Sequence, residues 1–164
     1  MMEHFVLAPE CVAFLRLVTA SLLGALVGWE RETHEKGAGL RTHMLISLGA
    51  CLFALVVLEM HKQFPGGDVM RVVQGLLLSI GFIAGGVIFT RGTSVTGLTT
   101  AAGLWVMTGV GLAIGLGYYV LGLLSTLLTF VIIAVLKRVE KLLHHKPVLT
   151  HAADGPAQNS APER

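Results

Sequence analysis

The chain has 164 residues, of which 54% are hydrophobic and 13% are charged. Ordinary globular domains contain about 25% charged residues, so this composition excludes a soluble domain and indicates an integral membrane protein. Twelve basic and ten acidic residues leave a net charge of only +2, which excludes the basic surface of a nucleic-acid-binding protein.

The N-terminal segment, residues 1–10, contains two carboxylates and neither Lys nor Arg. It therefore lacks the positive region of a cleavable signal peptide, and we expect the first hydrophobic segment to remain as a membrane anchor. Cys11 and Cys51 are too few, and lie in segments too apolar, to predict a disulfide framework or a zinc site.

Hydrophobic segments follow one another along most of the chain. Residues 11–29, 42–60 and 72–90 each approach the roughly 20 residues that a membrane-spanning helix needs. Residues 98–136 contain no formal charge, and as one helix they would be about 58 Å long, nearly twice the membrane thickness. This segment must fold back on itself, and the glycine-rich stretch from Gly115 to Tyr119 is the predicted turn.

The basic residues predict the orientation. Nine of the eleven Lys and Arg residues outside the hydrophobic segments lie in the first loop, the third loop and the C-terminal part of the chain. Basic residues concentrate on the cytoplasmic side, whereas a re-entrant fourth segment would divide them nearly evenly. We therefore predict an all-α polytopic membrane protein with five transmembrane helices over residues 11–136, with the N-terminus outside (N-out) and the C-terminus in the cytoplasm (C-in).

The C-terminal part of the sequence has two different compositions. Residues 137–147 combine basic residues with leucines, which predicts a short amphipathic extension at the membrane surface. Residues 148–164 are small and polar and contain prolines, so we expect a disordered tail.

Arg16 is the one formal charge well inside a predicted span. A charge near the centre of a transmembrane helix costs at least about 2.5–3.5 kcal/mol, so it usually faces a partner or a cavity. We predict that Arg16 pairs with Glu59, with Asp68 as the alternative acceptor. Snorkelling of Arg16 to the outer headgroups is the competing interpretation.

Glycines concentrate in residues 75–122, which contain 12 of the 20. Small residues let helix backbones approach closely in lipid, so we predict a tightly packed bundle with a homodimeric face. Adjacent glycines can instead break a helix around a substrate. The glycines at packing positions are Gly24, Gly28, Gly81, Gly85, Gly86, Gly111 and Gly115.

Two loops on the predicted cytoplasmic side contain candidate binding residues. The first loop is dense in both charge signs and ends at Thr42, a predicted cap of the second helix. The third loop is rich in hydroxyls at the start of the fourth helix, where they can satisfy free N–H groups or receive an anion. The candidates in and beside these loops are Glu30, Arg31, Glu32, Arg41, Thr42, His43, Thr99 and Thr100.

At these residues the sequence resembles the MgtC/SapB family of bacterial membrane proteins. The resemblance covers about residues 11–136. It adds Arg71 and Trp105 to the candidate functional residues. The sequence departs from the family pattern at Ser79 and Ala84, where the family usually has glycine. The resemblance is carried, in order, by Gly28 with residues 30–32, by 38–45 (AGLRTHML), by 71–75 (RVVQG), by 80–82 with 86–88, and by 95–102 (VTGLTTAA) with Trp105.

The resemblance implies a multi-pass protein of the bacterial inner membrane, associated with growth under magnesium limitation and, in pathogens, with intracellular survival and virulence. It implies that the protein binds and restrains other membrane proteins, such as the F-type ATP synthase, rather than carrying magnesium. Longer family members append a soluble domain, which we expect this chain to lack because 28 residues follow Leu136.

The alternative function is transport of Mg²⁺ or another cation. Magnesium prefers oxygen ligands, and Glu59 and Asp68 are the weak metal candidates near the predicted spans. The spans lack catalytic motifs, so we predict neither an enzyme nor a cofactor. The expected partners are membrane lipid, other inner-membrane proteins and a second copy of the chain.

Overall fold

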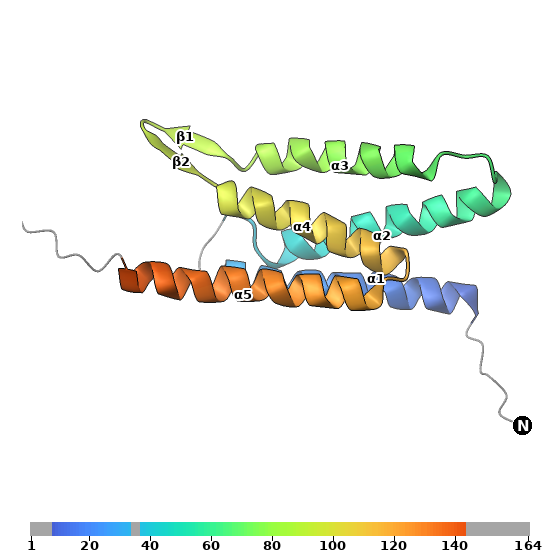
Figure 1. Ribbon diagram of the computed structural model, residues 1–164, viewed down its shortest axis with the longest axis horizontal. Coiled ribbons are helices and arrows are strands. Elements are labelled where there is room, and N and C mark those ends of the chain that lie inside the picture. The colour runs from blue at the N-terminus through green and yellow to red at the C-terminus, as the bar shows by residue number, and fades with distance from the viewer. Residues whose placement is uncertain (1–7, 34–36, 144–164) are drawn as a thin grey trace, which may run out of the picture.

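The computed structural model describes residues 8–33 and 37–143, which are mostly helical. Three of the helices are long and apolar enough to cross a membrane, which supports a helical membrane protein. Figure 1 shows the elements: α1 (Pro9–Glu32), α2 (Leu40–Gln63), α3 (Val69–Gly85), β1 (Phe89–Arg91), β2 (Ser94–Thr96), α4 (Leu98–Gly115) and α5 (Tyr119–Leu143). The three long apolar helices are α1, α2 and α4.

The predicted turn within residues 98–136 is confirmed. The fourth helix ends at Gly115 and the fifth begins at Tyr119. Gly117 has a φ of +91°, a left-handed conformation that residues with a Cβ rarely adopt, so the chain reverses where the glycines lie. The helix α5 continues to Leu143, while the side chains of 136–143 and the predicted tail 148–164 lie outside the described part of the protein.

The third helix is shorter than predicted. It ends at Gly85, with Gly86 at the cap position, so these two adjacent glycines terminate a helix instead of continuing it to Thr90. The chain then turns at Gly86 and Val87 and enters the first strand at Phe89.

The expected hydroxyl-rich third loop is a β-hairpin. Strands β1 and β2 are antiparallel, and Phe89 lies opposite Thr96. The strands are joined by two residues, of which Gly92 has a φ of +60°. Gly97 then passes so close to the Val87 carbonyl that a Cβ would overlap it, which sets the start of α4 against the end of α3.

Helices α1, α2 and α4 form the core through close glycine contacts. A Cβ on Gly24 would lie 2.5 Å from the His43 carbonyl oxygen, and one on Gly28 would lie 2.7 Å from Leu40 Cα. On α4, a Cβ on Gly111 would overlap the Ser47 carbonyl oxygen, and one on Gly115 would lie 2.5 Å from Ala54 Cβ. The close approaches at these glycines pack both α1 and α4 against α2, and α1 and α4 also contact each other. The side chains buried in this core include Leu104, Met107 and Ile114.

Helix α3 is packed loosely against this core, and Figure 1 shows it along the upper edge of the molecule. The buried residues of α3 are Ile80 and Ala84, whereas Phe82 is 88% exposed. Cβ atoms on Gly81 and Gly85 would meet nothing within 4 Å, so the close packing expected of this pair is not made within the described part of the chain. A groove of about 220 Å³ separates α3 from α2 and α4.

Candidate functional site

Five polar residues are buried at one end of the molecule. We call this the hairpin end: α1 ends there, α2 and α4 begin there, and the β1–β2 hairpin extends from it (Figure 1). All five side chains are at most 7% exposed, although they lie among apolar helices. This buried polar cluster consists of Glu30, Arg31, His43, Ser47 and Thr100.

The local sequence explains how each residue reaches the cluster. Glu30 and Arg31 occupy the last turn of α1, where a cation is favourable against the helix dipole. His43 and Ser47 are four residues apart and therefore share one face of α2. Thr100 is in the first turn of α4, just after the hairpin.

One hydrogen bond joins the end of α1 to the start of α4. Arg31 Nη2 donates to Thr100 Oγ1 at 2.8 Å, and both side chains are buried. The Arg31 guanidinium also interacts electrostatically with Glu30 and with His43. The charged first segment and the hydroxyl-rich third segment singled out in the sequence are therefore in direct contact.

His43 is held by a backbone contact at one ring nitrogen. Its Nδ1 lies 2.9 Å from the Gly39 carbonyl oxygen, one turn earlier. A carbonyl only accepts, so Nδ1 carries the proton and Nε2 of the neutral ring is an acceptor. The ring packs against Gly103, where a Cβ would lie 3.5 Å from Nε2.

Three atoms of the cluster have unused hydrogen-bonding capacity. Arg31 Nε, His43 Nε2 and Ser47 Oγ are buried and have no hydrogen-bond partner among the described residues. Buried polar atoms in folded proteins are nearly always paired with protein or ordered water. The cluster thus has the chemistry of a small site for water or another polar group.

The predicted cap of α2 at Thr42 is wrong. The helix begins at Leu40 after an extended Gly39, and its N-terminal position has no side-chain cap of its own. Instead, Glu32 reaches across from α1, and Leu40 N donates to its Oε2 at 2.6 Å. A carboxylate at this position satisfies a free N–H and complements the helix dipole.

Several other candidates of the hairpin end lie outside the cluster. The side chains of Arg41 and Thr99 are exposed, and Trp105 is 54% exposed on the outer surface of α4. Thr42 is half-buried. These residues border the cluster without entering it.

The expected pairing of Arg16 with Glu59 is wrong. Arg16 Nε donates to Tyr119 Oη at 3.0 Å, and Arg16 Nη1 donates to the Gly115 carbonyl oxygen at 2.7 Å. Glu59 instead pairs with Lys62 at 2.6 Å. The α4–α5 turn places a free helix carbonyl beside Arg16, and Glu59 has a cation on its own helix.

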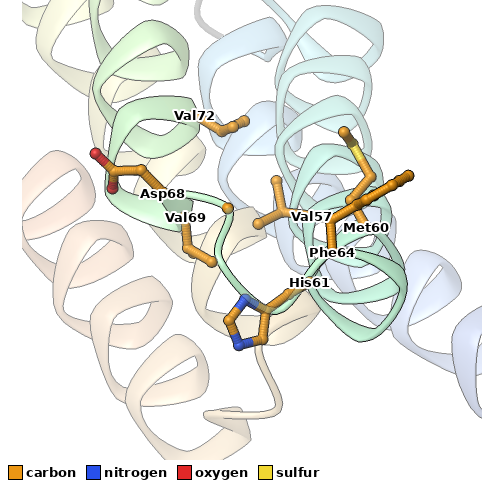
Figure 2. A pocket seen from close by; sticks show the side chains of 8 residues that line it. Val57, Met60, His61, Phe64, Asp68, Val69 and Val72 are labelled. Carbon is orange, nitrogen blue, oxygen red and sulfur yellow. The ribbon is translucent and has the colours of Figure 1, made fainter.

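Asp68, the alternative acceptor, also serves its own helix. Its Oδ1 accepts from Arg71 N and caps α3, and its Oδ2 lies 3.9 Å from Arg71 Nε. Figure 2 shows the apolar pocket of about 130 Å³ beside this cap, and the Asp68 carboxylate points away from the His61 ring. The metal candidates therefore do not converge, and the described residues contain no group of three or more His, Cys, Asp and Glu that could hold a metal ion.

Two functional contacts were not predicted from the sequence. Ser47 joins the cluster, and its only sequence signal is its spacing of four residues from His43. Tyr119 was assigned to the predicted turn, but nothing local to it indicates Arg16 as its partner.

Comparison with known proteins adds a family match. The MgtC family model matches residues 17–142. "Protein MgtC" of Salmonella paratyphi A is 37% identical over 138 residues, covering 84% of this chain and 58% of the relative. "Putative magnesium transporter YhiD" of Escherichia coli strain K12 is 36% identical over 139 residues, covering 80% of this chain and 64% of the relative. The chain thus spans about six-tenths of the length of these curated relatives, and no solved structure matches it.

Proposed function

The chain belongs to the MgtC family, and on this premise we propose that it is a multi-pass bacterial inner-membrane protein that acts in magnesium-limited growth by binding and restraining another membrane protein. The family match and the names of the relatives support the link to magnesium. The F-type ATP synthase is the partner that the family resemblance suggests, and a second copy of the chain is a further one.

The observation that carries the binding proposal is the open surface of α3. Gly81 and Gly85 lie one helical turn apart on this helix and meet no other segment of the described chain, and Phe82 is 88% exposed. In lipid, exposed small residues allow a helix of another protein to approach closely and gain dispersion contacts. Gly24 and Gly28 of α1 and Gly111 and Gly115 of α4 are already packed inside the core, whereas the glycine pair of α3 is available for packing against another protein.

The proposed topology has five spans with the N-terminus outside. The hairpin end contains the last turn of α1, the start of α2, the hairpin and the last part of α5 (Figure 1). These segments belong to the regions that contain most of the Lys and Arg residues. By the positive-inside rule we assign the hairpin end to the cytoplasm. The buried polar cluster then lies near the cytoplasmic surface and Arg16 near the outer one.

Transport of a cation is the second candidate, favoured by the name of the Escherichia coli relative, a putative magnesium transporter. Against it, Leu104, Met107 and Ile114 are fully buried and fill the core between the helices. The described carboxylates lie toward the two ends of the molecule, whereas a magnesium path needs oxygen ligands along its length. We infer that the chain acts by association, without catalysis.

Site-specific photo-crosslinking in native membranes tests the binding proposal. A photoreactive residue at Phe82 is expected to capture another membrane protein from cells grown at low magnesium. The same residue at Leu123, which is 56% exposed on α5, is the matched control and is expected to capture mainly lipid. Equal protein adducts at both positions would contradict a binding surface on α3.

Vesicles that contain only this protein test the transport alternative. The binding proposal expects no magnesium flux above that of empty vesicles. Flux that depends on the protein and is lost in Glu59→Gln would instead establish transport.

A further inference from the structure

The turn between α4 and α5 is set back from the end of the molecule. Helix α4 has 18 residues, whereas α1 and α2 have 24 each, and Figure 1 shows the turn well short of the start of α1 and the end of α2. The turn lies beside Arg16, which is seven residues, or about 10 Å, into α1. A polar turn is therefore recessed below the outer ends of its neighbours.

Arg16 is the cation at this recess, and its charge is only partly compensated. It donates to Tyr119 Oη and to the carbonyl oxygen of Gly115, the last residue of α4. The C-terminus of a helix supplies about half a negative charge. The carboxylates Glu59 and Asp68 at this end pair with Lys62 and Arg71, and no described carboxylate, Glu10 of α1 included, forms an ion pair with Arg16.

A groove opens next to this cation. It has a volume of about 470 Å³ and is lined by Gly117, two tyrosines and three aliphatic side chains of α5. Arg16 Nη2 lies 3.3 Å from the position of a Cβ on Gly117, so the guanidinium borders the groove where the missing side chain leaves space. Tyr118 is 62% exposed and Val120 is 72% exposed, which places aromatic and aliphatic surface beside one positive charge.

We propose that this groove binds an anionic phospholipid, with its phosphate on Arg16 and its acyl chain along the start of α5. A charged side chain at membrane depth usually faces an opposite charge, and a phosphate oxygen forms a strong, charge-assisted hydrogen bond with a guanidinium. Tyr118 and Tyr119 suit the interfacial level at which the headgroup lies. Val120, Leu121 and Leu124 provide the apolar surface for the chain.

Native mass spectrometry of the full-length protein, exchanged from detergent into defined lipid, tests this site. The protein is expected to retain phosphatidylglycerol over phosphatidylcholine by about fivefold, which corresponds to the roughly 1 kcal/mol contributed by one basic residue near anionic lipid. Arg16→Gln is expected to abolish this preference, whereas Arg16→Lys retains part of it because the charge remains without the planar fork. The matched control is Lys62→Gln, which removes an exposed cation at the same end and keeps the preference.

Three results would overturn the proposal: equal retention of the two lipids by the unmodified protein, an unchanged preference in Arg16→Gln, or crosslinking of Arg16 to a carboxylate of a second copy or another protein. If Arg16→Gln does not fold, the Tyr119→Phe variant removes one guanidinium contact and leaves the charge in place. This variant is expected to keep the phosphatidylglycerol preference. Loss of that preference would show that the site depends on the tyrosine hydroxyl rather than on the arginine charge.

Discussion

The buried polar residues of the hairpin end are positioned by partners far away in sequence. Arg31 donates to Thr100, which is 69 positions later, and both side chains are at most 6% exposed. Removing one partner of such a bond leaves a buried charged group with less solvation, which costs more than the bond itself contributes. This bond therefore fixes the end of α1 against the start of α4.

Replacing Thr100 with valine tests this bond. We expect Thr100→Val to lower the free energy of unfolding by about 1–3 kcal/mol, because Arg31 loses its acceptor while its burial is unchanged. The measurement is denaturant-induced unfolding of the purified protein in detergent. The adjacent Thr99→Val is the control, since Thr99 is exposed, and it is expected to change stability by less than about 0.5 kcal/mol. Equal losses in the two variants would contradict a specific role for the Arg31–Thr100 bond.

The helices differ in how they use their small residues. On α4, Gly111 and Gly115 lie against the backbone and side chains of α2, whereas Gly109 faces open space. On α3, Gly75, Gly81 and Gly85 all face open space. Glycines thus allow close helix packing in the core on α4, whereas on α3 they form a surface that no other described segment covers.

An alanine at Gly111 tests the α2–α4 contact. Its Cβ would overlap the Ser47 carbonyl oxygen, a backbone atom that cannot rotate away, so the helices must separate. We expect Gly111→Ala to destabilise the protein by about 1–3 kcal/mol, as overpacking does. Gly109→Ala is the control, and its better helix propensity is expected to stabilise the protein by up to about 1 kcal/mol. Thermal unfolding of both variants decides the question, and a stable Gly111→Ala protein would disprove the contact.

A leucine at Gly81 tests the open surface of α3. The side chain meets nothing in the described chain, so the thermal stability of the protein itself is expected to stay unchanged. Association with the partner is expected to weaken by at least about fivefold, because overpacking costs about 1–3 kcal/mol. The readout is the yield of the crosslinked partner. Gly75→Leu, on another side of α3, is the control, and an equal loss in both variants would place the contact elsewhere.

At the scale of the whole molecule, polar residues gather at the two ends and apolar residues fill the length between them. The hairpin end holds the buried polar cluster, and the opposite end holds Arg16 with the α2–α3 loop and the α4–α5 turn. Figure 1 shows the start of α2 and the hairpin at one end and the α2–α3 loop at the other. If the helices cross the membrane, these ends face different compartments.

Cysteine accessibility in intact cells tests this arrangement. In a background without Cys11 and Cys51, we expect Gly66→Cys in the α2–α3 loop to react with a membrane-impermeant maleimide from outside. Gly37→Cys in the first loop and Thr93→Cys in the hairpin are expected to react only after the membrane is opened, because basic residues hold these segments in the cytoplasm. Reaction of Gly66→Cys and Thr93→Cys from the same side would refute the proposed topology.

Much of the fold was predictable from the sequence because the signals are local. Hydropathy located the apolar helices to within a few residues, and Gly117 marked the turn where a left-handed backbone was required. The helix α3 was overextended in the prediction because Val87 and Ile88 are apolar enough for a span, although the chain turns at Gly86 and Val87 and enters strand β1 at Phe89. The candidate site was predictable only in part: the sequence singled out Arg31, His43 and Thr100 without showing that they meet.

The sequence by itself determined the class of the protein and the order of its helices, because the preference of an apolar segment for lipid depends on its own composition. Only the tertiary structure decided that Arg16 bonds Tyr119 and Gly115, that Glu32 caps α2, and that α3 keeps an open face. A polar side chain takes the nearest free partner in space, and that partner is set by how helices far apart in sequence pack together.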